Sequence, residues 1–427
     1  MIDGEYYTVD QLQTPSNFAA EPGTVTQLGS IQVSNPTNDD VLNIYTFEMT
    51  VESEIPPAGQ IEIVVPPEVQ LLESSTLSTA SCKTYTCINE TPQSIRFLIA
   101  TGFAKGDTIK LEVGGVHNPR SFKPTGEFII TSYDTDGVSL IDTGYNGIAE
   151  MTIAGPITSF STQASNLTNG DVNTYTFSVQ ATIPVIAGDQ MSFMIPSDMV
   201  PPADAATMDC QPLSNIIKMS CSIDGRKVMV LFEEFELADS AFTWSIAGIK
   251  NPGSTKPSEP FTDVDFLDAD GFIVSHYSET PVTVTNSFPA NLEINGPTLE
   301  QGSLKPSDVT YYEIIFTPVN ALPTTGSIQV TYPLLITLKD GPATVCEVSI
   351  TGSSFTDKCL IDDSARTITI KGVFASSPGY DGPISIKLLN VQNAINNKPG
   401  NGFVIQTYWD EQLNFFMDKL LDFILLP

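Results

Sequence analysis

The chain has 427 residues, of which 41% are hydrophobic and 16% are charged, so its composition is that of a folded chain and excludes general disorder. Its 19 basic and 50 acidic side chains give a formal net charge of −31. This charge excludes nonspecific binding to nucleic acid or to an anionic membrane. The 29 glycines and 31 prolines interrupt short strands with turns, as antiparallel sandwiches require.

Three repeats follow one another along the chain, and each carries the motif N-x4-K-P-x3-F. The motif asparagines stand 133 residues apart (251 − 118) and then 142 residues apart (393 − 251). The matched positions are Asn118, Lys123, Pro124 and Phe128, then Asn251, Lys256, Pro257 and Phe261, and then Asn393, Lys398, Pro399 and Phe403. Four matched positions at fixed offsets, three times over, exceed chance, and units of this length can bury their own cores.

Each repeat opens with a strand in which apolar and polar residues alternate, a pattern typical of a half-buried strand. The aspartates that lead these strands are Asp40, Asp171 and Asp308. A second alternating strand ends on a proline, which suits a strand end because proline cannot donate to a sheet ladder. These prolines are Pro66, Pro196 and Pro333. With no convincing amphipathic helix before the C-terminus, we predict an all-β fold of three tandem immunoglobulin-like antiparallel β-sandwich domains.

The predicted domain organisation follows the repeats. An N-terminal orphan strand and linker cover residues 1–25, and the three sandwich repeats cover residues 26–155, 156–296 and 297–427. The linkers lie near Ala154 to Thr158 and Ala290 to Pro297, and each contains a Gly-Pro pair. We expect this pair to make short, fairly stiff joints.

The first residues of the chain resemble the closing strand of a repeat. Residues 2–7 are similar to residues 141–145, whereas the third repeat lacks this Ile-Asp-x-Gly-Tyr strand in its last part, 409–427. Strand addition from one copy to the next would fill the unpaired sheet position and give an open fibre. We therefore predict head-to-tail self-association through the N-terminal strand. Truncation of a longer array is the alternative, since residues 1–5 do not begin a signal peptide.

The six cysteines fall two to each repeat, after the proline-ended strand: Cys82 and Cys87, Cys210 and Cys221, Cys346 and Cys359. Their spacing varies from 5 to 11 to 13 residues, whereas a metal site would keep its ligand spacing. A disulfide that closes a variable loop tolerates such drift. We predict three disulfides within the repeats, with free buried thiols as the alternative, and hence an extracellular or cell-surface location.

Two N-glycosylation sequons agree with that location. They begin at Asn89 and Asn166, whereas the similar Asn35 is excluded by the proline that follows it. We predict glycosylation at both sequons.

Aspartate-rich turns follow the motif strand in the first two repeats. The candidate calcium ligands are Asp134, Asp136, Asp268 and Asp270, because a D-x-D-G turn offers two carboxylates to a hard cation. No third carboxylate and terminal glutamate follow in register, and Asp-Gly is a common hairpin turn, so a plain turn is the favoured interpretation.

The sequence predicts no catalytic residues. The two histidines, His117 and His276, stand in unlike positions, and no nucleophile, phosphate-loop or dinucleotide motif is present. The repeated residues have a structural explanation, in which Asn-Pro starts a turn by bonding its own backbone and Lys-Pro leads into a strand. The apolar stretch 415–426 is too short for a transmembrane span.

The Asn-Pro-x-Ser-x-Lys-Pro stretch, the strand and Asp-x-Asp-Gly turn after it, the Tyr-Thr-Phe strand and the paired cysteines resemble tandem repeats of large extracellular surface proteins of ciliated protozoa, over residues 26 to about 410. The resemblance implies an extracellular β-sandwich array and supplies no catalytic residues. The third repeat departs from the pattern at Asn393-Ala394.

We therefore predict a non-enzymatic extracellular structural protein, the repeat subunit of a surface coat, an appendage or a head-to-tail filament. The alternative is a cell-surface adhesion or carbohydrate-binding module. The expected partners are other copies of the chain and glycans, with no nucleic acid, no transmembrane span and no cofactor other than calcium.

Overall fold

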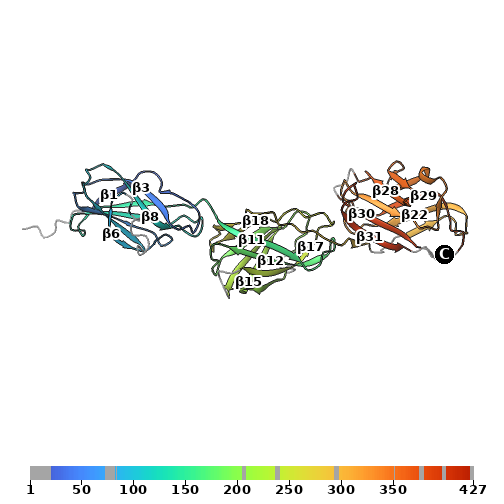
Figure 1. The fold of residues 1–427 in the computed structure, drawn as a ribbon, viewed down its shortest axis with the longest axis horizontal. Helices are drawn as coiled ribbons and strands as arrows, with labels where there is room; N and C mark the ends of the chain where they lie inside the picture. The colour runs from blue at the N-terminus through green and yellow to red at the C-terminus, as the bar shows by residue number, and fades with distance from the viewer. Residues whose placement is uncertain are drawn as a thin grey trace, which may run out of the picture. The chain divides into compact units, whose positions relative to one another are not determined.

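The protein is described by a computed structural model, which places residues 21–72, 82, 84–203, 208–235, 241–292, 298–350, 352–374, 379–396 and 401–423. The fold is all-β, and in these ranges the only helical element is a 3-10 turn at Gly341–Ala343 (Figure 1). The predicted fold class, a chain of immunoglobulin-like β-sandwiches, is therefore confirmed. No helix in the placed ranges is long and apolar enough to cross a membrane.

The chain divides into two compact units, Met1–Gly155 and Pro156–Pro427. The described residues form three separate hydrophobic cores, one in the first unit and two in the second. We call each core with its strands the first, second and third sandwich. The domain boundaries and the count of three independent domains stay predictions.

The described residues of the first sandwich form ten strands, nine of them in the hydrogen-bonded path β5-β8-β3-β1-β10-β9-β4-β7-β6 and the tenth, β2, paired with β3. Their bounds are β1 (Gly23–Gln27), β2 (Gln32–Val33), β3 (Asn43–Val51), β4 (Gly59–Val64), β5 (Gln70–Leu71), β6 (Thr86–Thr91), β7 (Ser94–Ile99), β8 (Thr108–His117), β9 (Phe128–Tyr133) and β10 (Leu140–Gly147). β1 connects the two layers, because it pairs in parallel with β10 and antiparallel with β3.

The second sandwich repeats this order as β14-β17-β12-β11-β19-β18-β13-β16-β15. Its strands are β11 (Gly155–Ala164), β12 (Val172–Ala181), β13 (Gln190–Met194), β14 (Cys210–Ser214), β15 (Ile216–Asp224), β16 (Lys227–Phe235), β17 (Phe242–Lys250), β18 (Thr262–Leu267) and β19 (Ile273–His276). Here β11 takes the place of β1 and β19 that of β10.

The third sandwich has two sheets, ordered β20-β31-β30-β23-β28-β27 and β21-β22-β29-β25-β26, with β24 on β29. Its strands are β20 (Ala290–Asn291), β21 (Thr298–Gln301), β22 (Val309–Phe316), β23 (Ser327–Thr331), β24 (Thr337–Leu338), β25 (Cys346–Ile350), β26 (Ser353–Phe355), β27 (Cys359–Asp362), β28 (Thr367–Lys371), β29 (Ile384–Gln392), β30 (Phe403–Tyr408) and β31 (Phe416–Phe423). Two strands do here what β1 does in the first sandwich: β20 makes the parallel pair, with β31, and β21 makes the antiparallel pair, with β22.

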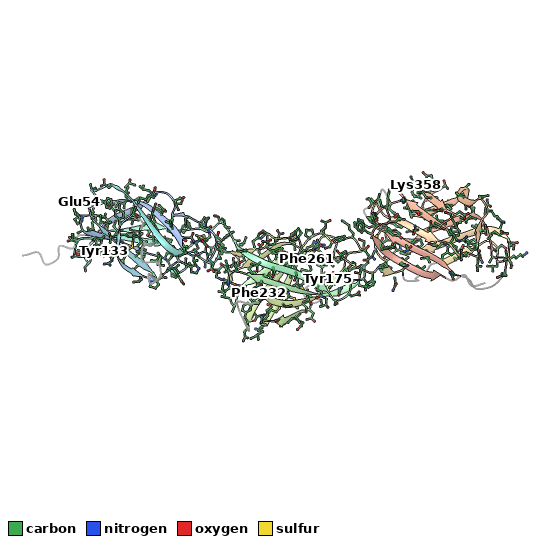
Figure 2. The ribbon with its side chains drawn as sticks, in the orientation of Figure 1. Glu54, Tyr133, Tyr175, Phe232, Phe261 and Lys358 are labelled. Carbon is green, nitrogen blue, oxygen red and sulfur yellow. A yellow bond between two sulfur atoms is a disulfide. The ribbon has the colours of Figure 1, made fainter. Side chains whose placement is uncertain are left out.

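The predicted alternating strands form the cores. Along β3, Tyr45, Phe47 and Met49 are buried and the residues between them are half-buried or exposed, as expected of a strand with one face on the core. The core of the second sandwich contains a cluster of aromatic rings, to which Phe261 belongs (labelled in Figure 2). Phe261 packs edge-on against Phe177 with ring centroids 5.8 Å apart. The alternation and the motif phenylalanine therefore predict core positions correctly.

One prediction about the third sandwich is wrong: its closing-strand position is filled. β31 pairs antiparallel with β30 and parallel with β20, as β10 pairs with β9 and β1. Asp418 takes the place of Asp142: both are fully buried, and their amides donate to hydroxyls of the facing strand, Thr407 Oγ1 at 2.9 Å and Ser132 Oγ at 3.0 Å. In the described part of the third sandwich the predicted acceptor position is therefore occupied by β31, and the predicted donor segment lies outside the described residues.

Candidate functional site

The repeated asparagine is the centre of a buried polar cluster at the end of each sandwich, which we call the asparagine node. In the first sandwich Asn118 follows β8, and its Nδ2 donates to the carbonyls of Asn35 and Thr37 at 2.8 and 2.7 Å. Its Oδ1 accepts a hydrogen bond from the Tyr45 hydroxyl at 3.1 Å. Asn118 and Tyr45 are 3% and 1% exposed, so the bond between them is buried, whereas the two bonds to the loop carbonyls are part-buried.

The node recurs unchanged in the other two sandwiches. Asn251 donates to the carbonyls of Asn166 and Thr168 at 2.9 and 2.8 Å and accepts from the Tyr175 hydroxyl. In the third sandwich Asn393 donates to the carbonyls of Ser303 and Lys305, both at 2.8 Å, and accepts from the Tyr312 hydroxyl at 2.7 Å. Burial raises the pKa of each of these tyrosines, which keeps the phenols neutral and able to donate.

The sequence-based explanation of this asparagine is therefore wrong in mechanism. The side chain does not bond its own turn; Asn118 reaches back 83 residues, to Asn35. The repeated tyrosine of the first strand and the repeated asparagine are two parts of one cluster. The aspartate that leads the strand also belongs here, because Asp40 Oδ2 accepts from Asn35 Nδ2 at 2.8 Å and Asp171 Oδ2 accepts from Asn166 Nδ2 at 2.8 Å.

The loop held by the node in turn holds the outgoing chain, through contacts that we call the exit bridge. Between the two carbonyls bound by Asn118, the Pro36 carbonyl accepts the amides of Thr152 and Ile153, both at 3.0 Å. The amide of Asn38 then donates to the Ile153 carbonyl at 2.9 Å. The bridge is parallel, with Thr37 opposite Ile153.

The second sandwich has the same exit bridge. The Leu167 carbonyl accepts the amides of Ser287 and Phe288 at 3.0 and 3.1 Å, and the Asn169 amide donates to the Phe288 carbonyl at 2.9 Å. The repeated motif therefore fixes the segment through which the chain leaves a sandwich.

Within the unit Pro156–Pro427, the same end of the second sandwich contacts the third. Asn169 is fully buried, and its Nδ2 donates to the carbonyls of Phe416 and Met417, both at 2.8 Å. The Thr255 amide also donates to Phe416 at 2.8 Å, and the motif lysine Lys256 places Nζ 5.6 Å from the ring centroid of Trp409. No sequence pattern singles out Asn169 as a site residue; its one signal is the Thr-Asn pair that it shares with Asn38.

Two glycines of the second sandwich make room for Asn320 of the third. A Cβ on Gly170 would lie 2.2 Å from Asn320 Oδ1, and one on Gly253 would lie 3.3 Å from Asn320 Cβ. Asn320 Nδ2 donates to Asp418 Oδ1 at 2.7 Å, and Thr407 Oγ1 donates to Asp418 Oδ2 at 3.0 Å. Burial raises the pKa of Asp418 to about 6, although these bonds favour its charged form.

The cysteines pair as Cys82–Cys87, Cys210–Cys221 and Cys346–Cys359. In the second sandwich the bonded residues lie on β14 and β15, the two ends of the strand order. Cys346 and Cys359 likewise join strands of the two different sheets of the third sandwich. Each disulfide thus fastens the two layers together away from the strands that carry the chain in and out.

The sequon at Asn166 has a structural role. Asn166 Oδ1 accepts from the Thr168 hydroxyl at 2.8 Å, while its Nδ2 is bonded to Asp171. Asn35 makes the equivalent bond with Thr37, at 2.7 Å, although Pro36 breaks its sequon. The Asn-x-Thr pattern is thus explained by the loop, and glycosylation at Asn166 stays a prediction. Asn89 lies in β6, and its side chain is outside the described part of the structure.

Of the predicted calcium ligands, Asp134, Asp136 and Asp268 cap their own turns. The Ser139 hydroxyl donates to Asp136 Oδ2 at 2.6 Å, and the amides of Ser139 and Val138 donate to Asp136 Oδ1 at 2.8 and 2.9 Å. The hydroxyl bond first, and then the two amide bonds, lower the pKa of Asp136 to about 2. Asp268 Oδ1 accepts the amides of Asp270 and Phe272 at 3.0 and 2.9 Å. Asp134 accepts the Thr135 amide. The described residues contain no group of three His, Cys, Asp or Glu side chains arranged for a metal, and calcium binding stays a prediction.

The histidines make isolated pairs. His117 Nε2 lies 2.9 Å from Asp39 Oδ1, and His276 Nδ1 lies 2.7 Å from Asp265 Oδ1. They belong to different compact units, Met1–Gly155 and Pro156–Pro427.

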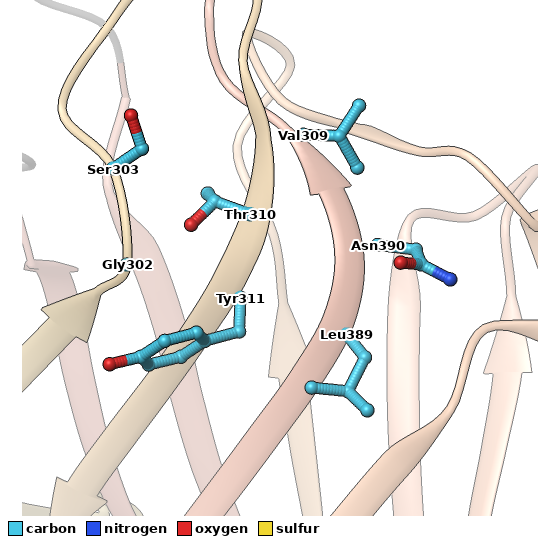
Figure 3. A pocket seen from close by; sticks show the side chains of 7 residues that line it. All are labelled: Gly302, Ser303, Val309, Thr310, Tyr311, Leu389 and Asn390. Carbon is cyan, nitrogen blue, oxygen red and sulfur yellow. The ribbon is translucent and has the colours of Figure 1, made fainter.

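An open depression of about 440 Å³ lies on the third sandwich (Figure 3). It is lined by Gly302, Ser303, Val309, Thr310, Tyr311, Leu389 and Asn390. The ring of Tyr311 is half-buried and carries Lys387 Nζ 4.5 Å from its centroid. An aromatic ring beside hydroxyl groups is the one feature here that suits a neutral polar ligand such as a sugar.

No known family profile matches the chain, and no curated protein matches its sequence. Among solved structures, the chain is similar to the N-terminal domain of a Streptococcus gordonii adhesin, with 9% identity over 94% of this chain and 90% of that chain and a TM-score of 0.23. It is also similar to the collagen adhesin of S. aureus, with 13% identity over 63% of this chain and 93% of that one and a TM-score of 0.20. A membrane-anchored protein of Corynebacterium diphtheriae, described as putative, gives 8% identity over 95% and 89% and a TM-score of 0.18. These neighbours are bacterial, so the resemblance to ciliate repeats stays a prediction, and we base no functional statement on such low scores.

Proposed function

We propose that the chain is a non-enzymatic extracellular structural protein, a repeat subunit of a surface coat, an appendage or a filament. One observation carries this proposal: the repeated polar residues hold the segment through which the chain leaves a sandwich. Asn118 and Asn251 are buried and fully hydrogen-bonded, so the chemistry that all repeats share is directed at the connection between them. A long array of domains needs the same connection between each domain and the next, and the repeated asparagine supports that connection.

The extracellular part of the proposal is supported by the three disulfides, because such bonds persist in oxidising compartments. The net charge of −31 would keep a crowded layer of such chains soluble by mutual repulsion. End-to-end association of copies belongs to the same proposal. The third sandwich supports it, because Asn393 holds the loop Ser303–Lys305 by two hydrogen bonds. In the other two sandwiches, the loop held in the same way binds the outgoing segment of the chain.

Electron microscopy of the native material tests this proposal directly. We expect the chain, located with an antibody to the folded first sandwich, in a regular coat or in filaments. Immunolabelling that finds only dispersed, soluble protein would contradict the structural role.

The second candidate is an adhesion or carbohydrate-binding module, and the depression beside Tyr311 favours it (Figure 3). A glycan array probed with the full chain separates the two functions. If the module is correct, binding is specific, and Tyr311→Ala abolishes it while Phe272→Ala, at an exposed aromatic residue of the second sandwich, does not.

A further inference from the structure

The strand by which the chain enters a sandwich lies next to the strand by which it leaves, and in the first and third sandwiches the two run parallel. In the first sandwich β1 pairs with β10 in the register Gly23 with Asp142, Thr24 with Thr143 and Val25 with Gly144. In the third sandwich β20 pairs with β31 at Ala290 with Asp418 and Asn291 with Lys419. In the second sandwich β11 and β19 are also neighbours.

A parallel pair responds to tension in a particular way. Pulling on the incoming end of β1 and on the outgoing end of β10 draws the two strands along their length in opposite directions. The hydrogen bonds cross that direction, so they are loaded together and must break together. If the pair were antiparallel, both pulled ends would lie at the same edge, and the bonds would be peeled apart one at a time.

The exit bridge adds a second parallel contact on the outgoing side. Thr37 stands opposite Ile153, and in the second sandwich Thr168 stands opposite Phe288, in both cases in parallel register. The loop on the inner side of this bridge is fixed by the asparagine node, whose asparagine side chains are buried. Tension that reaches Ile153 therefore passes into the body of the sandwich.

The entry strand is also fixed to the core. The second half of β1 pairs antiparallel with β3, from Val25 with Val51 to Gln27 with Met49, and Val25, Val51 and Met49 are buried. At the start of the pair, Asp142 Oδ2 accepts the Ser53 amide at 3.0 Å. Neither strand of the pair can shift without disturbing the packed interior.

We propose that the first and third sandwiches are tension-bearing elements, in which the parallel entry and exit strands form a shear clamp that resists unfolding when the chain is pulled from its ends. This inference rests on the proposed structural function and specifies it: the array would hold under load and not merely set a distance. The force axis is given by strand direction within each sandwich, so it needs no particular arrangement of one compact unit against the other.

The disulfides do not share this load. They join residues 5, 11 and 13 positions apart and lie away from the entry and exit strands. Reduction should therefore leave the force at which the clamp breaks almost unchanged while it lowers equilibrium stability.

Single-molecule pulling on the full chain tests the clamp with two pairs of attachment points that load only the first sandwich. One handle is fixed at Glu21, and the second is placed either at Pro156 or at Val138, through a single click-reactive residue at each exposed position. Pulling between Glu21 and Pro156 loads β1 and β10 in shear. Val138 precedes β10 at the edge where β1 begins, so pulling between Glu21 and Val138 peels the same pair. Both proteins have nearly the same sequence and equilibrium stability, and forced unfolding reports the barrier in each direction.

We expect a rupture force several-fold higher for the Glu21–Pro156 pair than for the Glu21–Val138 pair at the same pulling speed. Equal forces in the two directions would overturn the clamp, and so would a low force in both. Neither result would touch the structural function, which is tested separately by the presence of the chain in a coat or filament. Matching denaturation curves for the two labelled proteins exclude misfolding as the cause of a difference.

Discussion

At the residue scale, the motif asparagine is suited to its place because it offers two donors and one acceptor on a short side chain. In the second sandwich the two donors bind the carbonyls of Asn166 and Thr168, and the acceptor binds the Tyr175 hydroxyl. An aspartate would lack the donors, and a glutamine would carry them one methylene too far.

Asn251→Leu should therefore be strongly destabilising. It leaves two carbonyls and one phenol without partners, and each such loss costs about 1–3 kcal/mol, so we expect the free energy of unfolding of the second sandwich to fall by about 3 kcal/mol or more. Tyr175→Phe is the matched control, because it removes one hydroxyl and should cost about 1 kcal/mol. Urea denaturation followed by tryptophan fluorescence in a Trp409→Phe background reports this sandwich, since Trp244 lies in its core and Trp409 is the second of the two tryptophans. Equal losses for the two variants would contradict the role assigned to the loop carbonyls.

Asp418 should make the stability of the third sandwich depend on pH. Burial raises its pKa from 3.8 to about 6 in the folded state, so the folded chain binds the proton more tightly than the unfolded chain does. The resulting stabilisation is complete below about pH 4 and is lost as the pH rises through about 6, with an amplitude of about 3 kcal/mol for a shift of about two pH units.

Asp418→Asn provides the control for this dependence. The amide mimics the protonated acid and should remove the change between pH 4 and pH 7 while other carboxylates continue to titrate. The measurement is the difference in urea midpoint between the two proteins at each pH. A difference that does not vary with pH would show that Asp418 does not titrate in this range.

At the element scale, period-two alternation predicted the strands that open each repeat and those that end on proline, because burial of one sheet face leaves a direct record in the sequence. β31 was missed because its Phe-Met-Asp-Lys-Leu sequence shares only the buried aspartate with the Ile-Asp-Thr-Gly-Tyr of β10. The exit bridge was missed for a different reason. It is made by backbone groups of Pro36 and Ile153, which leave no side-chain pattern.

The stabilisation given by each disulfide should follow the length of the loop it closes. The separations are 5, 11 and 13 residues in the first, second and third sandwich. Replacing Cys210 and Cys221 by alanine should cost about 3 kcal/mol, and replacing Cys82 and Cys87 about 2 kcal/mol, on the chain-entropy estimate. Chemical denaturation of the two double variants gives both numbers. A larger loss of stability for the Cys82–Cys87 variant would mean that packing around the disulfide, and not chain entropy, dominates the stabilisation.

At the scale of the whole molecule, the contact between the second and third sandwiches depends on Gly170. Gly170→Ala adds a Cβ 2.2 Å from Asn320 Oδ1, and Asn320 cannot move without weakening its bond to Asp418. We expect faster hydrogen exchange at the Thr255 amide, which donates to Phe416 across this contact. Each 1.4 kcal/mol lost from the contact accelerates exchange about tenfold.

Gly225→Ala is the control for backbone strain. Gly225 and Gly170 have similar φ values, 58° and 68°, but a Cβ on Gly225 would meet nothing within 4 Å. This variant should lower stability slightly and leave exchange at Thr255 unchanged. Accelerated exchange in both variants would assign the effect to φ and not to the contact with Asn320.

The glycine pocket around Asn320 has a consequence for the order of the sandwiches. The positions of Gly170 and Gly253 are held by Asp39 and Arg120 in the first sandwich and by Ser307 and Ile395 in the third. The position of Asn320, 13 residues before the closing proline (333 − 320), is held by Ser53 in the first sandwich and by Ile183 in the second. The framework of the repeats is shared, whereas the residues at their ends differ from copy to copy. A gene rearrangement that exchanged two repeats would preserve every core and every asparagine node, yet it would set Asn320 against Asp39 and Arg120. The contact inside the unit Pro156–Pro427 is therefore specific to the order in which the second sandwich precedes the third.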